Sequence, residues 1–198
     1  MIRFGQATAR ATLFALGLGA LVPLPFFAQS ARAETAIAPE KNPPGDIPDS
    51  QVFVVFSSES YTLKVPEGWA RTVTGPNVSF ASKLDGVSVT LTPATIAPTL
   101  DWVKAQYLPD LIKAGRAVKT TAVSAETLAG GPVIRIEYTS NSEPNPVTTK
   151  QIRLENARFL FFKSGTLAAL DLYAPAGADN VDQWQLMSRS FAWHEGDA

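Results

Sequence analysis

Few side chains in this sequence are capable of catalysis. His194 is the single histidine and there is no cysteine, which excludes thiolate chemistry, disulfide bonds, Cys-ligated zinc and multi-histidine metal sites. A histidine that acts as a base or a metal ligand needs companion groups, and His194 stands close to the end of the sequence, where chains commonly fray. We therefore expect an exposed His194 without a catalytic role, no bound metal and no cofactor.

Motifs for covalent and nucleotide chemistry are also missing. The sequence contains no Gly-x-Ser-x-Gly elbow, no Ser-x-x-Lys pair, no P-loop and no dinucleotide-binding glycine pattern. Its 17 Lys and Arg residues are balanced by 18 Asp and Glu residues, for a net charge of −1. Such a chain has no excess of positive charge to hold a phosphate backbone, so we do not expect a nucleic-acid-binding protein. Because the catalytic motifs are missing, we do not expect an enzyme either.

Asp171 is the most conspicuous acid, because it lies inside the apolar run 167–173. A buried acid with a shifted pKa in a cleft can be functional. Strand alternation offers a simpler interpretation, in which Leu170 and Leu172 point into the core and Asp171 points away. A carboxylate-dependent hydrolase using Asp171 or nearby acids stays open as an alternative, and it would need two acids converging in a concave site.

A second set of charged residues could form a face that recognises a ligand: Arg135, Glu137, Lys150, Arg153 and Glu155. Cross-strand ion pairs on a solvated face are the commoner explanation of such a pattern. We keep Arg135 and Arg153 as candidate binding residues.

The four tryptophans could frame an apolar pocket or a docking surface. Trp69 and Trp184 are expected in the core, because one follows a turn and the other lies on an apolar helix stripe. Trp102 flanks an apolar stripe without joining it, so it is the best candidate to face a partner. A small apolar-ligand carrier is therefore a further alternative.

The elements that must position these residues are mostly strands. Two turn-like connections, at 155–157 and 163–165, are so short that the strands around them must pair antiparallel. Short apolar or alternating runs predict strands over 52–56, 61–65, 78–81, 87–91, 118–128, 133–138, 148–154, 158–162 and 167–173.

Two helices complete the expected fold. The clearest covers 98–115, with Thr99 as its cap, a kink or restart at Pro109 and an end at Gly115; the second covers about 179–191. The run 159–162 is apolar on both faces and needs cover on both sides of the sheet. The sequence thus predicts an α+β protein in which helices cover an antiparallel sheet.

The first 33 residues are typical of a secretory signal peptide. Arg3 and Arg10 precede the uncharged stretch 11–30, and Ala31-Arg32-Ala33 offers a cleavage point after Ala33. This stretch is almost long enough to remain as a membrane anchor, but its two prolines argue against a continuous spanning helix. We therefore expect a soluble protein exported to a bacterial periplasm, with membrane contact only if the segment is retained.

The rest of the chain divides into three parts. Residues 34–50 contain four prolines and almost no large apolar side chains, which predicts an extended and disordered leader. Residues 51–194 form the single folded domain, and 195–198 a flexible end.

The folded part resembles the PsbP-like domain family. The resemblance covers Phe53 to Trp193 and rests on the run Tyr61–Trp69 and the strand 87–91, followed by a central helix, a three-strand meander and a closing helix that ends Ser188-Arg189-Ser190-Phe191. It implies an α/β/α sandwich. The family includes an extrinsic subunit of the photosynthetic oxygen-evolving complex, a Ran-binding nuclear import factor and many exported bacterial proteins without assigned activity. What it implies is a binding or assembly module, and no functional residue of the family carries over to this sequence.

Together these interpretations favour an exported, non-catalytic module that binds a partner or assembles a complex of the bacterial envelope. Its candidate binding residues are Trp102, Arg135, Arg153 and Asp171. A docking module should show a shallow exposed patch, a carrier a deep apolar cavity, and a hydrolase a polar cleft.

Overall fold

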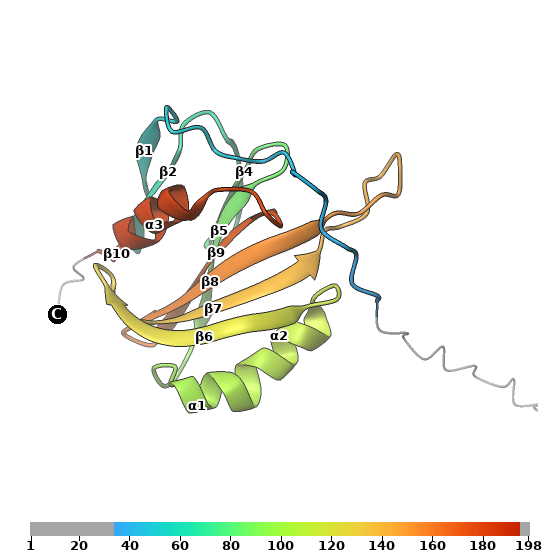
Figure 1. Ribbon diagram of the computed structural model, residues 1–198. Helices are drawn as coiled ribbons and strands as arrows, with labels where there is room; N and C mark the ends of the chain where they lie inside the picture. The colour runs from blue at the N-terminus through green and yellow to red at the C-terminus, as the bar shows by residue number, and fades with distance from the viewer. Residues whose placement is uncertain (1–33, 195–198) are drawn as a thin grey trace, which may run out of the picture. The chain divides into compact units, whose positions relative to one another are not determined.

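The computed structural model describes residues 34–194. Two predictions, the signal peptide over 1–33 and the flexible end over 195–198, lie outside these residues. The described chain folds into two antiparallel sheets and a few short helices (Figure 1). This arrangement confirms the α+β class.

The larger sheet has seven strands in the order β3-β4-β5-β9-β8-β7-β6, and every neighbouring pair is antiparallel. Ser164 and Gly165 form the turn between β8 and β9 with positive φ angles of 47° and 79°, a geometry that matches the strand twist in tight hairpins. The strands are β3 (Ala70–Thr74), β4 (Asn77–Ala81), β5 (Gly86–Pro93), β6 (Lys119–Leu128), β7 (Gly131–Asn141), β8 (Arg153–Lys163) and β9 (Thr166–Pro175).

The smaller sheet contains three strands in the order β1-β2-β10: β1 (Phe53–Ser57), β2 (Tyr61–Pro66) and β10 (Ala192–Trp193). Its last strand follows directly after α3 (Val181–Ser190) and brings the end of the described chain back to β2. The smaller sheet therefore ties the beginning of the folded domain to its end.

The central helix is continuous but changes its winding. It consists of α1 (Leu100–Trp102), a π-helical turn η1 (Val103–Tyr107) and α2 (Leu108–Ala114). Thr99 caps its start by accepting a hydrogen bond from the Trp102 N–H. The N–H of Leu108 bonds to the Val103 carbonyl, five residues back, directly before Pro109, which has no N–H to continue the ordinary ladder. The restart expected from Pro109 is thus realised as a π turn.

Two hydrophobic cores lie on opposite faces of the larger sheet. On one face Phe159 and Phe161 pack with Phe191, which follows α3, and with buried residues of β2, β4 and β5. On the other face Leu160 and Phe162 pack against the central helix, where Val103 is fully buried. The prediction that the run 159–162 requires cover on both faces is therefore confirmed.

The helices cover these faces only in part. The segment α1–α2 lies along one face of the larger sheet and α3 lies across the other, beside β1 and β2 (Figure 1). Ile112, an apolar residue of α2, is 48% exposed, so α2 buries only part of its apolar surface against the sheet. Among residues 34–194, no helix has both the length and the apolar character needed to cross a membrane.

The leader, residues 34–50, differs from the disordered segment expected. It forms no helix or strand, but Ile47 is only 4% exposed and joins the first core. The Ile47 N–H donates to the Asn180 side chain at 2.6 Å, and the Asn180 amide donates to the Gly45 carbonyl at 2.9 Å. Partners more than 130 residues away in the sequence thus hold the leader against the start of α3.

One expected turn is absent. Residues 155–157, read as a connection between two strands, lie inside β8, which runs without interruption from Arg153 to Lys163. The buried Asn156 amide donates to the Tyr138 carbonyl and to the Ser140 hydroxyl of β7. Because these hydrogen bonds satisfy the Asn156 amide inside the sheet, the residue can lie within a continuous strand instead of a turn.

Candidate functional site

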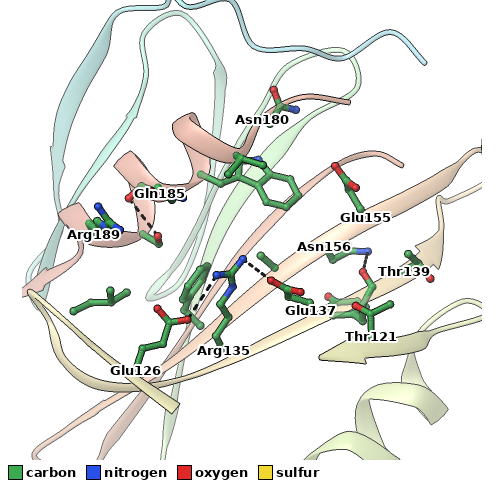
Figure 2. Close-up of a pocket in the computed structure, with 17 residues that line it drawn as sticks. Thr121, Glu126, Arg135, Glu137, Thr139, Glu155, Asn156, Asn180, Gln185 and Arg189 are labelled. Carbon is green, nitrogen blue, oxygen red and sulfur yellow. Dashed lines mark hydrogen bonds and ion pairs between the residues drawn. The ribbon is translucent and has the colours of Figure 1, made fainter. Parts of the chain in front are cut away.

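A cavity of about 350 Å³ lies between α3 and the face that β6, β7 and β8 turn toward it (Figure 2). We call it the α3 cavity. Its wall is amphipathic: Leu128, Phe159 and Trp184 provide apolar surface, and charged and amide side chains provide the rest. Strand alternation explains the charged part, because Arg135 and Glu137 are two residues apart and point to the same face of β7.

Arg135 is the centre of the charged network. Its guanidinium forms ion pairs with Glu137 on the same strand and with Glu126 on β6, the latter at 3.7 Å. The guanidinium carbon lies 5.7 Å from the centre of the Phe159 ring, within the range of a cation–π contact. Its Nε is buried and has no hydrogen-bond partner among the described residues. Arg135 is therefore neutralised by two carboxylates.

Glu155 is the carboxylate of the cavity that lacks a counter-charge. It lies opposite Thr139 in the β7–β8 register, and no Lys, Arg or His of residues 34–194 approaches it within ion-pair distance. Burial raises the pKa of Glu155 and the neighbouring Glu137 raises it further, against the lowering effect of the Gly177 backbone N–H. A cationic group beside Glu155 would offset both unfavourable contributions by favouring the ionised carboxylate.

The helix side of the cavity comes from one face of α3. Trp184, Gln185, Ser188 and Arg189 recur at helical spacing and line the cavity together. Arg189 forms no ion pair with Glu155 in the structure of residues 34–194, and Figure 2 shows the two side chains on different sides of the cavity. Asn180, held by the leader, borders the cavity at the start of the helix.

Arg135 is the one residue among the four sequence-based candidates that lines the α3 cavity. Arg153 is only 5% exposed, and its guanidinium donates to the Ala117 carbonyl, the Thr139 hydroxyl and the Asn141 side chain. Burial lowers the pKa of Arg153. Arg153 is thus a buried structural cation and does not form part of an exposed charged face.

Asp171 lies on the opposite face of the sheet, beneath the central helix. Its carboxylate takes two hydrogen bonds from Arg158 on the neighbouring strand, and Arg158 also donates to the Tyr107 hydroxyl at 3.0 Å. Leu170 and Leu172 point the other way and are fully buried. A bidentate pair beneath a helix leaves Asp171 no free oxygen directed at a cleft, so it stands apart from the cavity.

Trp102 also lies away from the cavity. It is half-buried, packs against the second core and contacts Tyr107, with 5.7 Å between the ring centres. Its free side borders an open hollow that includes the exposed Ile96. Trp102 therefore combines a packing role with a partly accessible surface.

His194 is exposed, as expected, although it is not free of contacts. Its Nε2 lies 3.0 Å from the Ser58 carbonyl and 3.3 Å from the Ser57 hydroxyl. The described residues contain no group of three or more acidic or histidine side chains placed to hold a metal ion. Within residues 34–194, His194 thus contacts a serine hydroxyl but forms no ion pair with an acid.

The sequence alone missed several cavity residues, among them Glu126, Gln185 and Arg189. Glu126 faces the cavity because β6 contains a register shift between Thr120 and Ala122, and a bulge of this kind reverses which residues face a given side. The helical spacing of residues 184–189 was the usable signal for the other two. Glu137 and Glu155 had been recognised as members of a charged face.

Comparison with known proteins supports the fold and nothing finer. No protein-family model and no curated protein matches the sequence. The structure is similar to that of cyanobacterial PsbP, called CyanoP, from Synechocystis sp. PCC 6803, with a TM-score of 0.51 and 16% identity over 76% of this chain and 99% of CyanoP. A protein of unknown function from Pseudomonas aeruginosa, PA94, aligns with a TM-score of 0.42 and 13% identity over 67% of this chain and 91% of PA94. The chain has a PsbP-like fold.

Proposed function

We propose that this chain is an exported, non-catalytic binding module of the bacterial envelope, a PsbP-like α/β/α domain that holds a ligand or partner group in the α3 cavity. The observation that carries the proposal is the Glu155 carboxylate, which faces a cavity of about 350 Å³ without a cationic partner among residues 34–194. The similarity to CyanoP supports the domain type, and the pattern of residues 1–33 supports export.

The walls of the cavity favour a positively charged group on an apolar stem. Glu155 provides the counter-charge, while Trp184 and Phe159 provide aromatic surface for a methylene chain or a cation. Arg135 is already paired with two carboxylates, so an anion entering here would meet repulsion without gaining a free cation at that position. A lysine or arginine side chain of a partner protein has the required chemistry.

The two alternatives fit this cavity less well. A carrier of a wholly apolar ligand would have to bury the Glu155 carboxylate without a counter-charge, which is costly. A carboxylate-dependent hydrolase would rely on Glu137 and Glu155 rather than Asp171, since these two acids share the cavity and burial raises the pKa of Glu155. Such an enzyme would lose its turnover on the neutral substitution Glu155→Gln.

Site-specific photo-crosslinking tests the proposal. A photoreactive amino acid at Gln185, on the rim of the cavity, should capture a defined envelope component in cells that produce the protein. The same amino acid at Ile112, exposed on the opposite side of the sheet, serves as the control. Glu155→Gln should reduce capture at Gln185 by about tenfold, because it removes a partly desolvated charge interaction. Equal capture from both positions would contradict the assignment of the cavity.

A further inference from the structure

A second binding arrangement lies at the other end of the leader, where residues 34–37 contact Arg116, Asn141 and Gln151. We call these three residues the leader site. The Glu34 carboxylate accepts hydrogen bonds from Gln151 at 2.6 Å, Asn141 at 3.2 Å and Arg116 at 3.3 Å. Three donors from separate segments therefore converge on one carboxylate, which is the arrangement expected of a carboxylate receptor.

The leader site also forms hydrogen bonds with the backbone of the leader. The Asn141 amide nitrogen donates to the Thr35 carbonyl at 2.9 Å, and its oxygen accepts from the Ile37 N–H at 3.1 Å. One amide side chain thus satisfies a donor and an acceptor of an extended chain, without regard to the side chains at positions 35 and 36. This two-point contact recognises an extended peptide as such.

The receptor side is rigidly built. Asn141 is only 4% exposed, and its side-chain oxygen also accepts from the buried Arg153 at 2.9 Å. Gln151 is held by a hydrogen bond to the Ser142 carbonyl at 3.0 Å. Arg153 therefore acts as a positioning residue for Asn141 through a contact that does not involve the leader.

Open space next to the leader site is not filled by residues 34–37. Asn141 borders two open hollows of about 550 and 570 Å³, one toward Tyr107 and Leu111 and the other toward Lys150. Glu34 borders neither of them. A longer peptide bound in the same way would have room for side chains that the leader does not supply.

We propose that the leader site is a receptor for an extended acidic peptide segment of a partner protein, and that residues 34–37 occupy it as an intramolecular competitor. The recognised pattern is a carboxylate followed by an extended backbone. The inference is independent of the α3 cavity, because none of the three site residues lines it. Since the leader is tethered, its effective concentration at the site reaches the millimolar range, so a partner peptide binds only when the leader is weakened or displaced.

Competition by a synthetic peptide tests this inference on the exported protein. Glu34→Arg puts a cation against Arg116 and should release the leader, which NMR of the Asn141 side-chain amide would report. A fluorescent peptide with the sequence of residues 34–40, Glu-Thr-Ala-Ile-Ala-Pro-Glu, should then bind this variant at least about tenfold more tightly than it binds the wild-type chain. Replacing the first Glu of the peptide by Gln should weaken binding about tenfold, because a charge-assisted contact is lost.

A charge-swapped double variant provides the matched control. Glu34→Arg combined with Arg116→Glu restores an ion pair of opposite sense, so the leader should return to its site and the acidic peptide should no longer bind. The proposal is overturned if the peptide fails to bind the Glu34→Arg chain whose leader is released, or if a peptide beginning with Lys binds that chain equally well. Either result would make the leader site a simple intrachain contact.

Discussion

Arg158 and Asp171 face each other across β8 and β9 and form a two-point ion pair beneath the central helix. Their side chains are 20% and 15% exposed. Burial alone would lower the pKa of Arg158, but the charge and hydrogen bonds of Asp171 outweigh it and raise the pKa above its ordinary value. The Tyr107 and Tyr138 rings lie 5.8 and 5.9 Å from the same guanidinium. Arg158, held in place by Asp171, therefore links the sheet to the central helix through its hydrogen bond to the Tyr107 hydroxyl.

Removing one member of this pair should be strongly destabilising. Asp171→Asn leaves the Arg158 charge largely buried without a counter-ion, and we expect a loss of about 3 kcal/mol in the free energy of unfolding. The double variant Arg158→Met with Asp171→Leu should lose much less, since no isolated charge remains. Urea unfolding of the three proteins measures both values, and equal losses in the single and double variants would contradict a buried pair.

Phe161 should be among the most sensitive positions of the first core. It is fully buried, and its ring stacks on Phe191 with 4.2 Å between centroids. We expect Phe161→Ala to lower the free energy of unfolding by about 3 to 5 kcal/mol, from lost burial and the cavity left behind. Val73→Ala on the exposed strand β3 is the control and should change it by less than about 0.5 kcal/mol. A loss below about 1 kcal/mol for Phe161→Ala would show that the site collapses freely.

The sequence predicts the parts of this fold that local patterns determine. Alternation and the doubly apolar run 159–162 indicated most of the strands, the two faces of the sheet and the shared orientation of Arg135 and Glu137. The turn expected at 155–157 was wrong because the turn-forming Asn156 is satisfied by groups on β7. Such a partner is 16 to 18 residues away, and no local pattern reveals it.

Long-range contacts also explain why the packing of the leader and the lining of the α3 cavity could not be predicted from the sequence. Proline-rich composition gave no sign that Ile47 enters the core, because its partners Asn180 and Gln183 come from the last helix. Likewise, Glu126 joins the cavity only through the β6 register shift. Which residues line the α3 cavity therefore depends on how segments distant in the sequence pack together.

The leader should be anchored chiefly through Ile47. Ile47→Ala removes a side chain that is 4% exposed, and we expect a loss of about 2 kcal/mol, at the low end for core positions because the leader can detach locally. Hydrogen exchange of the Ile47 amide, bonded to Asn180, should accelerate far more than exchange in β8. Ile96→Ala, at an exposed position, is the matched control. Equal acceleration throughout the domain would indicate global rather than local opening.

The contact of Glu34 with the leader site should weaken in acid. Hydrogen bonds from Gln151 and Asn141, followed by the charge of Arg116, lower the pKa of Glu34 below its reference value of 4.5, against a smaller opposing effect of burial. A carboxyl group whose pKa is lower in the folded state stabilises that state fully above its unfolded pKa. This contribution is lost as the pH falls below 4.5 and through the folded-state pKa.

The difference in unfolding free energy between the wild-type chain and Glu34→Gln should therefore be constant near neutral pH and shrink toward about pH 3. Urea unfolding across this range measures it, and the exposed Glu40→Gln variant shows how much of any change arises from neutralising an acid elsewhere in the leader. Arg116→Gln should reduce the pH dependence of the Glu34→Gln difference only in part, because the hydrogen bonds from Gln151 and Asn141 lower the pKa of Glu34 more than the charge of Arg116 does. A difference that persists unchanged in acid would mean that the neutral carboxyl group binds the leader site as well as the ionised one, and that the site does not read charge.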